Sequence, residues 1–538
     1  MVDESDATPH VPATASLGGD GWLTSPAKNL RSRCVALVVL MAIIGLLISQ
    51  SSVRRVGDGV EYMGMAYAIS TGHSPALSPV EFKATSHFLD SFGAASGFPG
   101  VLAIDRQYQN SAHGQDFAHF WMYSALAAPG VALARLVGLN ANWSFVLVNL
   151  SLYGLAAWLA LRRLGLPGTW FLFLSPVIWW LDKSVTESFT FSLLSIAFLL
   201  LEEAPWWSLI CLAFAADQNP PIALVIPVVI VAALLRDRSR LRDKRMWVGT
   251  AGAVLIAILH PVFFETQLGA ITPESLTTVH WQIPSLAIVL APLTDLNMGL
   301  LVNFPMFIVG LVIAVGLIAR RRWRDIMTPE IGAAAAAAIV FLTSFAQNTQ
   351  VNSGGTPSLN RYDLWLIPLL VPALVICYRQ DPRRMFRWFL PIAVISSLLS
   401  IATYQPSKPE AWLTPSSLAS YVWAHDPSLD DPIPGVFFDR EAHSGSAIAP
   451  VGTPTCSKVL LVDGDTPKAC PIRQLPPIGC MRTSTSICYA NSSEPQRDIR
   501  TGHGYSFSIW SGPPGNPAVS PQFSRLDILR YLRMHHHL

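Results

Sequence analysis

The chain has 538 residues, of which 51% are hydrophobic and 13% charged, and its formal net charge is +2. Soluble proteins carry roughly 25% charged residues, so this composition argues against an ordinary soluble protein and favours a polytopic membrane protein. Because nucleic-acid-binding proteins concentrate basic side chains on one face, the nearly balanced charge predicts no nucleic-acid partner.

The N-terminal segment, residues 1–33, is polar and precedes the first apolar run. It contains Asp3, Glu4 and Asp6, so it is too long and too acidic for the basic region of a signal peptide. We therefore expect a disordered cytoplasmic tail, followed by a retained membrane helix at 34–53.

Apolar runs recur throughout residues 34–403, which we expect to form an all-α transmembrane bundle. A helix that crosses the hydrocarbon core needs about 20 apolar residues. The runs predict about eleven crossings, with a tolerance of nine to thirteen because several runs are short or broken. They cover 34–53, 117–134, 136–161, 164–181, 188–201, 204–235, 246–264, 296–319, 331–360, 364–378 and 388–403.

Clusters of arginine indicate the orientation of the bundle. Cytoplasmic loops are enriched in Lys and Arg, and such clusters occur at 236–245, 320–324 and 379–387. These loops and the N-terminus are therefore expected in the cytoplasm. The long loop 54–116 and the region 404–538 would then lie on the outer side.

Two acidic residues, Asp58 and Glu61, follow the first apolar run directly. The spacing of apolar residues from Glu61 to Ser70 predicts a short amphipathic helix along the membrane interface. In a membrane-facing cleft these carboxylates could act as a general base or share a divalent metal ion. Alternatively, Asp58 caps the helix and Glu61 completes a capping box. The residues alone leave both interpretations open, and the two are compatible.

The far end of the loop 54–116 carries a second polar group, formed by His113, Asp116 and His119. Side chains at positions i, i+3 and i+6 near a helix start could converge on one site, as metal ligands or substrate contacts. The structural alternative is an interfacial helix start with Asp116 as its N-cap.

Three charged residues stand at unusual places in the apolar region. Lys183 and Glu187 are four positions apart, which predicts a helix-surface ion pair that faces the bundle interior or a polar cavity. Arg361 lies at the outer end of an expected helix, although arginine is otherwise concentrated in the loops expected in the cytoplasm. A guanidinium there could hold a phosphate, or its side chain could simply extend to the interface.

The C-terminal region, residues 404–538, is rich in Pro, Ser, Asp and Gly. The segments 458–464 and 505–510 have strand-like composition, so we expect a separate and mainly β domain on the outer side. Its four cysteines lack a C-x-x-C spacing, which favours disulfides over a zinc site. These disulfide candidates are Cys456, Cys470, Cys480 and Cys488.

Short motifs in the membrane region resemble the GT-C superfamily of integral membrane glycosyltransferases, which includes protein O-mannosyltransferases and bacterial aminoarabinose transferases. The resemblance spans most of residues 34–403 and leaves the C-terminal domain unassigned. It is carried by GDGVEY (57–62), HFWMYSALAAPGVAL (119–133), Ser175-Pro176 with Glu187, GLLVNFP (299–305) and GGTPSLNRY (354–362).

The resemblance implies transfer of a sugar from a polyprenyl-phosphate donor to a glycan, lipid or protein hydroxyl, on the outer face of a bacterial inner or plasma membrane. Asp58 would match the catalytic acid of the first loop, Glu61 would be its partner, and Arg361 would hold the lipid phosphate. In the family the two acids are often adjacent, whereas Gly59 and Val60 separate them here. The catalytic carboxylate and any divalent metal requirement therefore stay open.

Two other functions fit parts of the sequence. The Asn219-Pro220-Pro221 break within an apolar run suits a transporter or flippase of lipid-linked saccharides, in which broken helices line the substrate site. A catalytically inactive envelope scaffold would use the outer domain for docking. The chain has no strand-linked G-x-G-x-x-G and no P-loop motif, so a nucleotide donor in a Rossmann domain is not expected.

Overall fold

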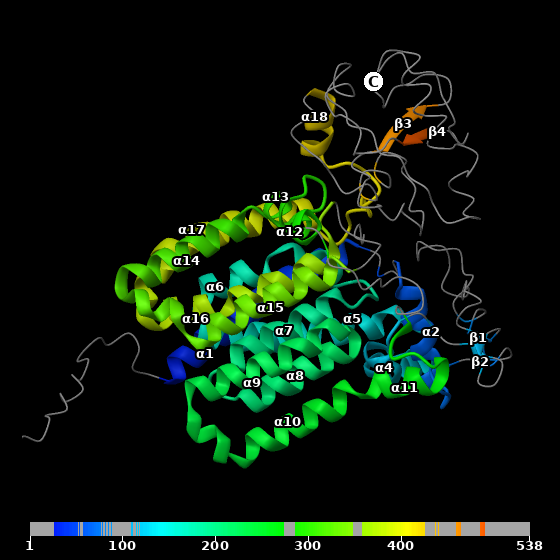
Figure 1. Ribbon diagram of the computed structural model, residues 1–538, viewed down its shortest axis with the longest axis horizontal. Helices are drawn as coiled ribbons and strands as arrows, with labels where there is room; N and C mark the ends of the chain where they lie inside the picture. The colour runs from blue at the N-terminus through cyan, green and yellow to red at the C-terminus, as the bar shows by residue number, and fades with distance from the viewer. Residues whose placement is uncertain are drawn as a thin grey trace, which may run out of the picture.

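The computed structural model of the protein is dominated by a helical bundle whose helices run along its long axis (Figure 1). The structure describes most of residues 26–425, together with two strands and two single positions in the C-terminal region. The described residues are 26–51, 53, 57–76, 78, 81, 84, 85, 88, 109, 110, 114, 115, 117, 119–273, 284, 286–347, 358–425, 436, 440, 459–463 and 485–489.

Within the described residues, each apolar run of the sequence contains helix. The α-helices are α1 (Pro26–Ser49), α2 (Gly59–Ser70), α4 (Met122–Val137), α5 (Asn142–Arg163), α6 (Gly165–Phe173), α7 (Glu187–Leu200), α8 (Pro205–Gln218), α9 (Val225–Arg236), α10 (Lys244–Ala257), α11 (Leu259–Leu268), α12 (Leu286–Thr294), α13 (Leu300–Asn303), α14 (Met306–Arg322), α15 (Pro329–Phe345), α16 (Val371–Gln380), α17 (Pro382–Tyr404) and α18 (Ser417–His425). The 3₁₀ segments are η3 (Pro176–Trp180), η4 (Pro220–Leu224), η5 (Arg238–Arg242), η7 (Trp323–Met327) and η8 (Arg361–Leu370).

Within the described part of the chain, five helical segments are long and apolar enough to cross a membrane, fewer than the eleven or so expected. They are Leu30–Ser49, Asn142–Arg163, Lys244–Leu268, Arg361–Gln380 and Pro382–Tyr404, and four further apolar helices have 10–17 residues. The difference arises partly because prolines divide the runs, since a proline has no N–H for the helix ladder. Pro176 follows the end of α6, and Pro220 follows the end of α8.

Helix α7 lies at the centre of the bundle and is buried along nearly its whole length. By contrast, α1, α10 and α17 present large apolar side chains outward, such as Val38, Val248 and Leu398, each more than 60% exposed. A water-facing surface would carry polar residues at these positions. The bundle therefore has the apolar exterior of a protein that contacts lipid.

Helix α2 forms where the apolar spacing predicts it, but its burial is greater than the single apolar face of an amphipathic helix would give, and its position at the membrane interface stays a prediction. Met63, Met65 and Ala66 are each no more than 1% exposed, so the helix is buried on more than one face. Gly64 allows this packing, because a Cβ there would lie 3.1 Å from the ring of Phe117. Helix α2 thus packs into the protein and helps to build its interior.

The two ends of the bundle differ in character. The turns from α9 to α10, from α14 to α15 and from α16 to α17 lie together at one end, and α2, α4 and α11 lie at the other (Figure 1). At the first end, which we call the arginine-rich end, Glu202 pairs with Arg236 at 2.5 Å and also with Arg379. Glu203 pairs with Arg163. These ion pairs join α5, α9 and α16 next to the α7–α8 turn.

The chain after α17 is fastened back onto the bundle. Arg440, only 1% exposed, donates from Nη2 to the Ser358 carbonyl oxygen at 2.8 Å, and from Nη1 toward the Thr414 carbonyl oxygen at 3.3 Å. Val436 packs against Met298 in a small apolar cluster. The region that follows therefore starts from a fixed point on the bundle.

Two antiparallel strands are described in the C-terminal region, β3 (Val459–Asp463) and β4 (Thr485–Tyr489), with Leu461 opposite Ile487. Strand β3 matches the segment expected at 458–464. The rest of the expected β domain lies outside the described residues, as do Cys456, Cys470, Cys480 and the side chain of Cys488. The disulfides stay a prediction, and the described cysteines, Cys34, Cys211 and Cys377, are free.

Between α2 and α4 the structure also describes a short antiparallel pair, β1 (Gln109–Asn110) and β2 (Gly114–Gln115), with Asn110 opposite Gly114.

Candidate functional site

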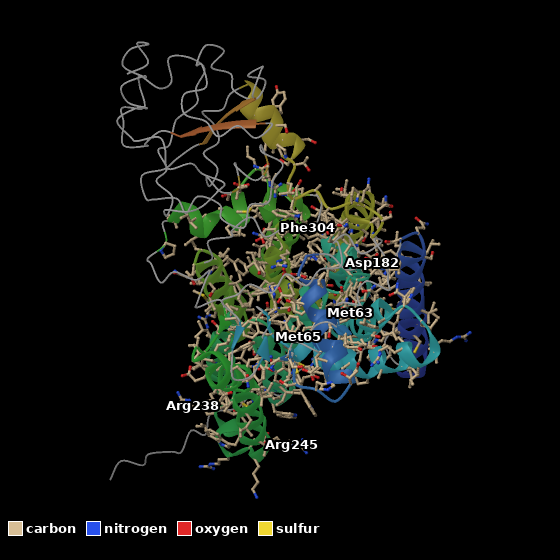
Figure 2. All side chains as sticks on the ribbon, turned by 90° about the vertical axis from the view of Figure 1, so that its right-hand side faces the viewer. Met63, Met65, Asp182, Arg238, Arg245 and Phe304 are labelled. Carbon is tan, nitrogen blue, oxygen red and sulfur yellow. The ribbon has the colours of Figure 1, made fainter. Side chains whose placement is uncertain are left out.

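Five charged side chains from four separate segments meet at the end of the bundle opposite the arginine-rich end. They are Asp58 and Glu61 at the start of α2, His119 before α4, Glu187 at the start of α7 and Arg361 at the start of η8. Figure 2 looks onto this end, with Met63 and Met65 of α2 near the centre of the view. We call these five residues the charged cluster.

Arg361 and His119 connect the carboxylates of the charged cluster. Arg361 Nη1 lies 2.5 Å from Asp58 Oδ2, and Arg361 Nε lies 3.5 Å from Glu187 Oε1. His119 Nε2 lies 3.3 Å from Asp58 Oδ2, and its Nδ1 lies 3.1 Å from Glu61 Oε2. Asp58 therefore contacts both cationic partners.

The cluster is graded from accessible to buried. The side chains of Asp58, Glu61, His119 and Arg361 are between 19% and 26% exposed, whereas that of Glu187 is only 2% exposed. A ligand that approaches from this end would meet the first four residues, with Glu187 behind Arg361.

The Asp58 carboxylate does not cap α2, although Asp58 occupies the N-cap position. Its backbone carbonyl accepts hydrogen bonds from the N–H groups of Glu61 and Tyr62 at 3.0 and 3.2 Å, but its side chain makes no cap hydrogen bond. Gly57, with φ +48°, provides the turn that precedes it. The capping-box alternative is therefore wrong for Asp58, and its carboxylate is directed to Arg361 and His119.

The backbone around Arg361 is held by local hydrogen bonds. The Asn360 side chain accepts from the backbone N–H of Tyr362 at 3.0 Å and so caps η8. The backbone N–H of Asn360 donates to the Met298 carbonyl oxygen at 3.1 Å. Ser358 has φ 93°, an uncommon conformation for a residue other than glycine. The Arg361 guanidinium also donates to the Tyr362 hydroxyl at 3.0 Å. The backbone before Arg361 and the hydroxyl of Tyr362 after it therefore hold the guanidinium in place.

Mutual charge sets the protonation of the accessible members. Burial by itself raises the pKa of Asp58, but Arg361 and His119 outweigh it and hold that pKa well below its ordinary value of 3.8. Burial lowers the pKa of His119, but Asp58 and Glu61 raise it well above its ordinary value of 6.5. In the state described, an ionised Asp58 therefore faces a protonated His119 near neutral pH.

Tyr62 lies beside the charged cluster and was not identified from the sequence. Its ring makes edge contacts with the His119 ring at 5.5 Å and with the Tyr123 ring at 5.8 Å. Burial, the largest influence, raises the pKa of its hydroxyl above the ordinary value of 10.0. Tyr62 therefore stays neutral, and its ring packs against the ring of His119.

Lys183 does not form the expected ion pair with Glu187. Its ammonium group is fully buried and donates to Asp182 Oδ1 at 2.6 Å and to the carbonyl oxygens of Trp179 and Pro406 at 2.6 and 3.0 Å. The expected pair needs a helix from Lys183 to Glu187, but α7 begins only at Glu187. Glu187 consequently faces Arg361, and Lys183 belongs to a separate buried pair.

His113 and Asp116 lie outside the described residues, so only His119 of the second polar group is placed in the cluster.

The described residues contain no group of three or more His, Cys, Asp or Glu side chains arranged to hold a metal ion. Moreover, the Arg361 guanidinium lies against Asp58 and would repel a divalent cation there. A divalent metal ion shared by Asp58 and Glu61 stays an untested prediction.

The fold and the site define an α-helical protein with several membrane-length helices, and with the charged cluster at the end of its bundle opposite the arginine-rich end. No protein-family model and no curated protein matches the chain. Among solved structures, it is similar to "Crystal Structure of ArnT from Cupriavidus metallidurans in the apo state", at 14% identity and TM-score 0.44, covering 76% of this chain and 82% of that chain.

A second similar structure is "Crystal Structure of ArnT from Cupriavidus metallidurans bound to Undecaprenyl phosphate". It is 13% identical with a TM-score of 0.42, and the match covers 69% of this chain and 76% of that chain. These values describe a distant likeness in the path of the chain and say nothing about the substrate of this protein.

Proposed function

We propose that the protein is a membrane glycosyltransferase that moves a sugar from a polyprenyl-phosphate donor to an acceptor hydroxyl. The observation that carries the proposal is the convergence of Asp58, Glu61, His119, Glu187 and Arg361 from four segments. A partly accessible carboxylate beside a guanidinium offers a proton acceptor and an anion-binding group in one place. The GT-C-like motifs of the sequence assign the same two roles to Asp58 and Arg361.

In the proposed reaction Asp58 accepts the proton of the acceptor hydroxyl. The hydroxyl oxygen forms a bond to the anomeric carbon, and the bond from that carbon to the phosphate oxygen breaks. The electron pair leaves with the polyprenyl phosphate, and the anomeric configuration is inverted. Arg361 stabilises the charge that grows on the departing phosphate through bidentate hydrogen bonds.

The ion pair between Arg361 and Asp58 supports a coupling between donor binding and base strength. As long as Arg361 contacts Asp58, the lowered pKa makes this carboxylate a weak base. A donor phosphate would compete for the guanidinium. Once Arg361 turned toward the phosphate, the pKa of Asp58 would rise toward its ordinary range, so that the base becomes effective when the donor is bound.

The proposal includes an orientation in the membrane. The arginine-rich end is assigned to the cytoplasm, so the charged cluster and the C-terminal region lie on the outer side of a bacterial inner or plasma membrane. A polyprenyl-linked donor in the same membrane would reach the cluster from the lipid. The acceptor would be a glycan, a lipid or a protein at the outer surface.

The test is complementation of a deletion strain with Asp58→Asn at normal expression, with envelope glycans analysed by mass spectrometry. Asparagine keeps the size of the side chain and removes its basicity. Asp243→Asn is the matched control, because Asp243 caps α10 at the arginine-rich end with a hydrogen bond from Arg245 N–H that asparagine can also accept.

The proposal predicts that the deletion and Asp58→Asn lack the same sugar, while Asp243→Asn restores it. Glu61→Gln then separates the two acids, since a partner role predicts partial activity and a base role predicts none. Full restoration of the wild-type glycan by Asp58→Asn would overturn the proposal in favour of a transporter or scaffold.

A further inference from the structure

Helix α4 begins without the side-chain cap that usually satisfies the first N–H groups of a helix. The residue at its N-cap position is Trp121, which makes no side-chain cap hydrogen bond. The early N–H groups of a helix have no partner within it. In this protein, side chains from α8 and α11 supply the partners, although both helices are distant from α4 in the sequence.

Gln218 at the end of α8 holds the chain on both sides of the α4 start. Its Oε1 accepts from the N–H of Tyr123 at 2.9 Å, and its Nε2 donates to the carbonyl oxygen of Phe120 at 3.0 Å. Gln218 is only 2% exposed, so water does not compete effectively for these bonds. One amide group therefore fixes the backbone of residues 120–123.

His260 of α11 supplies the other partner. Its Nε2 accepts from the N–H of Trp121 at 2.9 Å, and its Nδ1 lies 2.7 Å from Asp217 Oδ1. Because Nε2 accepts, the neutral ring carries its proton on Nδ1, the nitrogen nearer Asp217, and Asp217 Oδ1 also accepts from the backbone N–H of His260 at 3.2 Å. The rings of Phe120 and Trp121 pack against that of His260 at 5.2 and 4.4 Å.

Asp217 and Gln218 are held in place by the same helix break that the sequence shows. Helix α8 ends at Gln218, and the side chain of the next residue, Asn219, donates to Thr190 Oγ1 on α7 at 2.7 Å. The break therefore anchors the end of α8 against the central helix. At this end, Gln218 bonds to the backbone at the start of α4, and Asp217 bonds to His260 of α11.

We propose that Asp217, Gln218 and His260 are positioning residues that hold His119 against Asp58 and Glu61. Gln218 and His260 bond to the backbone of residues 120–123, which follows His119 directly, and Asp217 acts through His260. The inference deepens the proposed function and rests on it for the role of His119. It assigns a task to the Asn219-Pro220-Pro221 break without any transport activity.

The test uses the full-length protein in lipid nanodiscs and the variants Gln218→Leu, His260→Leu and His260→Gln. Glutamine at position 260 keeps an acceptor for Trp121 N–H and a donor for Asp217, whereas leucine keeps neither. Gln380→Leu is the matched control for Gln218→Leu, because Gln380 donates to Asp325 Oδ2 at the arginine-rich end. The readouts are hydrogen exchange over residues 119–123, titration of His119 by histidine-selective NMR, and transfer kinetics.

The leucine variants at 218 and 260 should speed exchange of the Trp121 or Tyr123 amides at least about tenfold, the factor that corresponds to a difference of 1.4 kcal/mol. They should also lower the titration midpoint of His119, reduce kcat and move the acid limb of the pH–rate profile to higher pH. Binding of undecaprenyl phosphate, used as the probe for Arg361, should not change. His260→Gln should restore all of these readouts, and Gln380→Leu should change none.

Unchanged exchange and an unchanged His119 titration in both leucine variants would overturn the inference. Faster exchange without any change in His119 titration would overturn it as well, because the bonds would then serve folding only. Exchange and titration need no substrate. Failure of the proposed function, seen as full complementation by Asp58→Asn, is therefore distinguishable from failure of the positioning role.

Discussion

Arg361 and Asp58 are 303 positions apart in the sequence, and yet the guanidinium Nη1 lies 2.5 Å from the carboxylate Oδ2. Arg361 also reaches Glu187, which is 2% exposed. The charged cluster therefore exists only after the first loop, the central helix and the η8 segment have packed together. Arg361 neutralises charge for both acids, so its removal should affect stability as well as activity.

Arg361→Ala should destabilise the protein because it leaves Glu187 buried without its cationic partner. Removal of one member of a buried ion pair costs about 3–5 kcal/mol, and the partly exposed Asp58 should contribute little. Thermal unfolding in detergent measures the effect. Adding Glu187→Gln to the same chain should recover much of the loss. Equal melting temperatures for the single and double variants would show that Glu187 does not depend on Arg361.

The contribution of His119 to the free energy of unfolding should decrease as the pH rises. Its pKa is raised in the folded state, so its contribution is fully present below the unfolded pKa of about 6.5 and is lost as pH rises through the folded pKa. Asp58 behaves oppositely: its pKa is lowered, so its contribution is present above about 3.9 and is lost as pH falls.

Melting temperatures of wild type and His119→Gln between pH 5 and pH 10 test this pH dependence. The difference between the two proteins should be largest at pH 5–6.5 and should shrink as pH rises above that range. A difference that grows with pH would contradict the raised pKa of His119.

Lys183→Met should reduce stability and leave the activity of the folded fraction intact. Lys183 and Asp182 are fully buried together, and Ser51 also donates to Asp182 at 2.6 Å. Loss of the ammonium group leaves a buried carboxylate with one hydroxyl partner, for a cost of about 3–5 kcal/mol. Activity per folded molecule and melting temperature should be measured together. A loss of activity without a loss of stability would return Lys183 to the substrate-binding residues.

Gly249→Ala should separate α10 from α8. A Cβ at Gly249 would lie 2.6 Å from the Cβ and 2.8 Å from the Cα of Trp206, and backbone atoms cannot yield as a flexible side chain does. Overpacking of this kind costs about 1–3 kcal/mol. Gly316→Ala on α14 is the control, because nothing lies within 4 Å of its added Cβ. It should stabilise the helix by up to about 1 kcal/mol. Thermal unfolding of both variants tests the prediction, because only Gly249→Ala should lower the melting temperature.

Local patterns in the sequence predicted the positions of the helices well, because every apolar run contains helix where the structure describes it. They also named all five members of the charged cluster. Their partners could not be predicted, since contacts such as Arg361 to Asp58 depend on how distant segments pack. Lys183 shows the limit most clearly. A spacing of four residues implies contact only on a continuous helix, and the chain between Lys183 and Glu187 is not helical.

The spacing of residues also could not predict which side chains are buried. The spacing in α2 correctly indicated one apolar face, but Met63 and Ala68 lie outside that spacing and are also buried. Asp217 and His260 are 43 positions apart, with a helix break between them, so no sequence spacing connected them. Each case depends on which surface a distant helix covers.

The Arg440 anchor has a consequence for the C-terminal region. Arg440 donates to the carbonyl oxygen of Ser358, three positions before Arg361, so the chain is tethered at residue 440 to the segment that leads into η8. A short tether gives an attached group an effective concentration on the order of millimolar at its anchor point. A group attached within a few residues of Arg440 would therefore meet the segment before η8 at a high local concentration, even when it is scarce in solution.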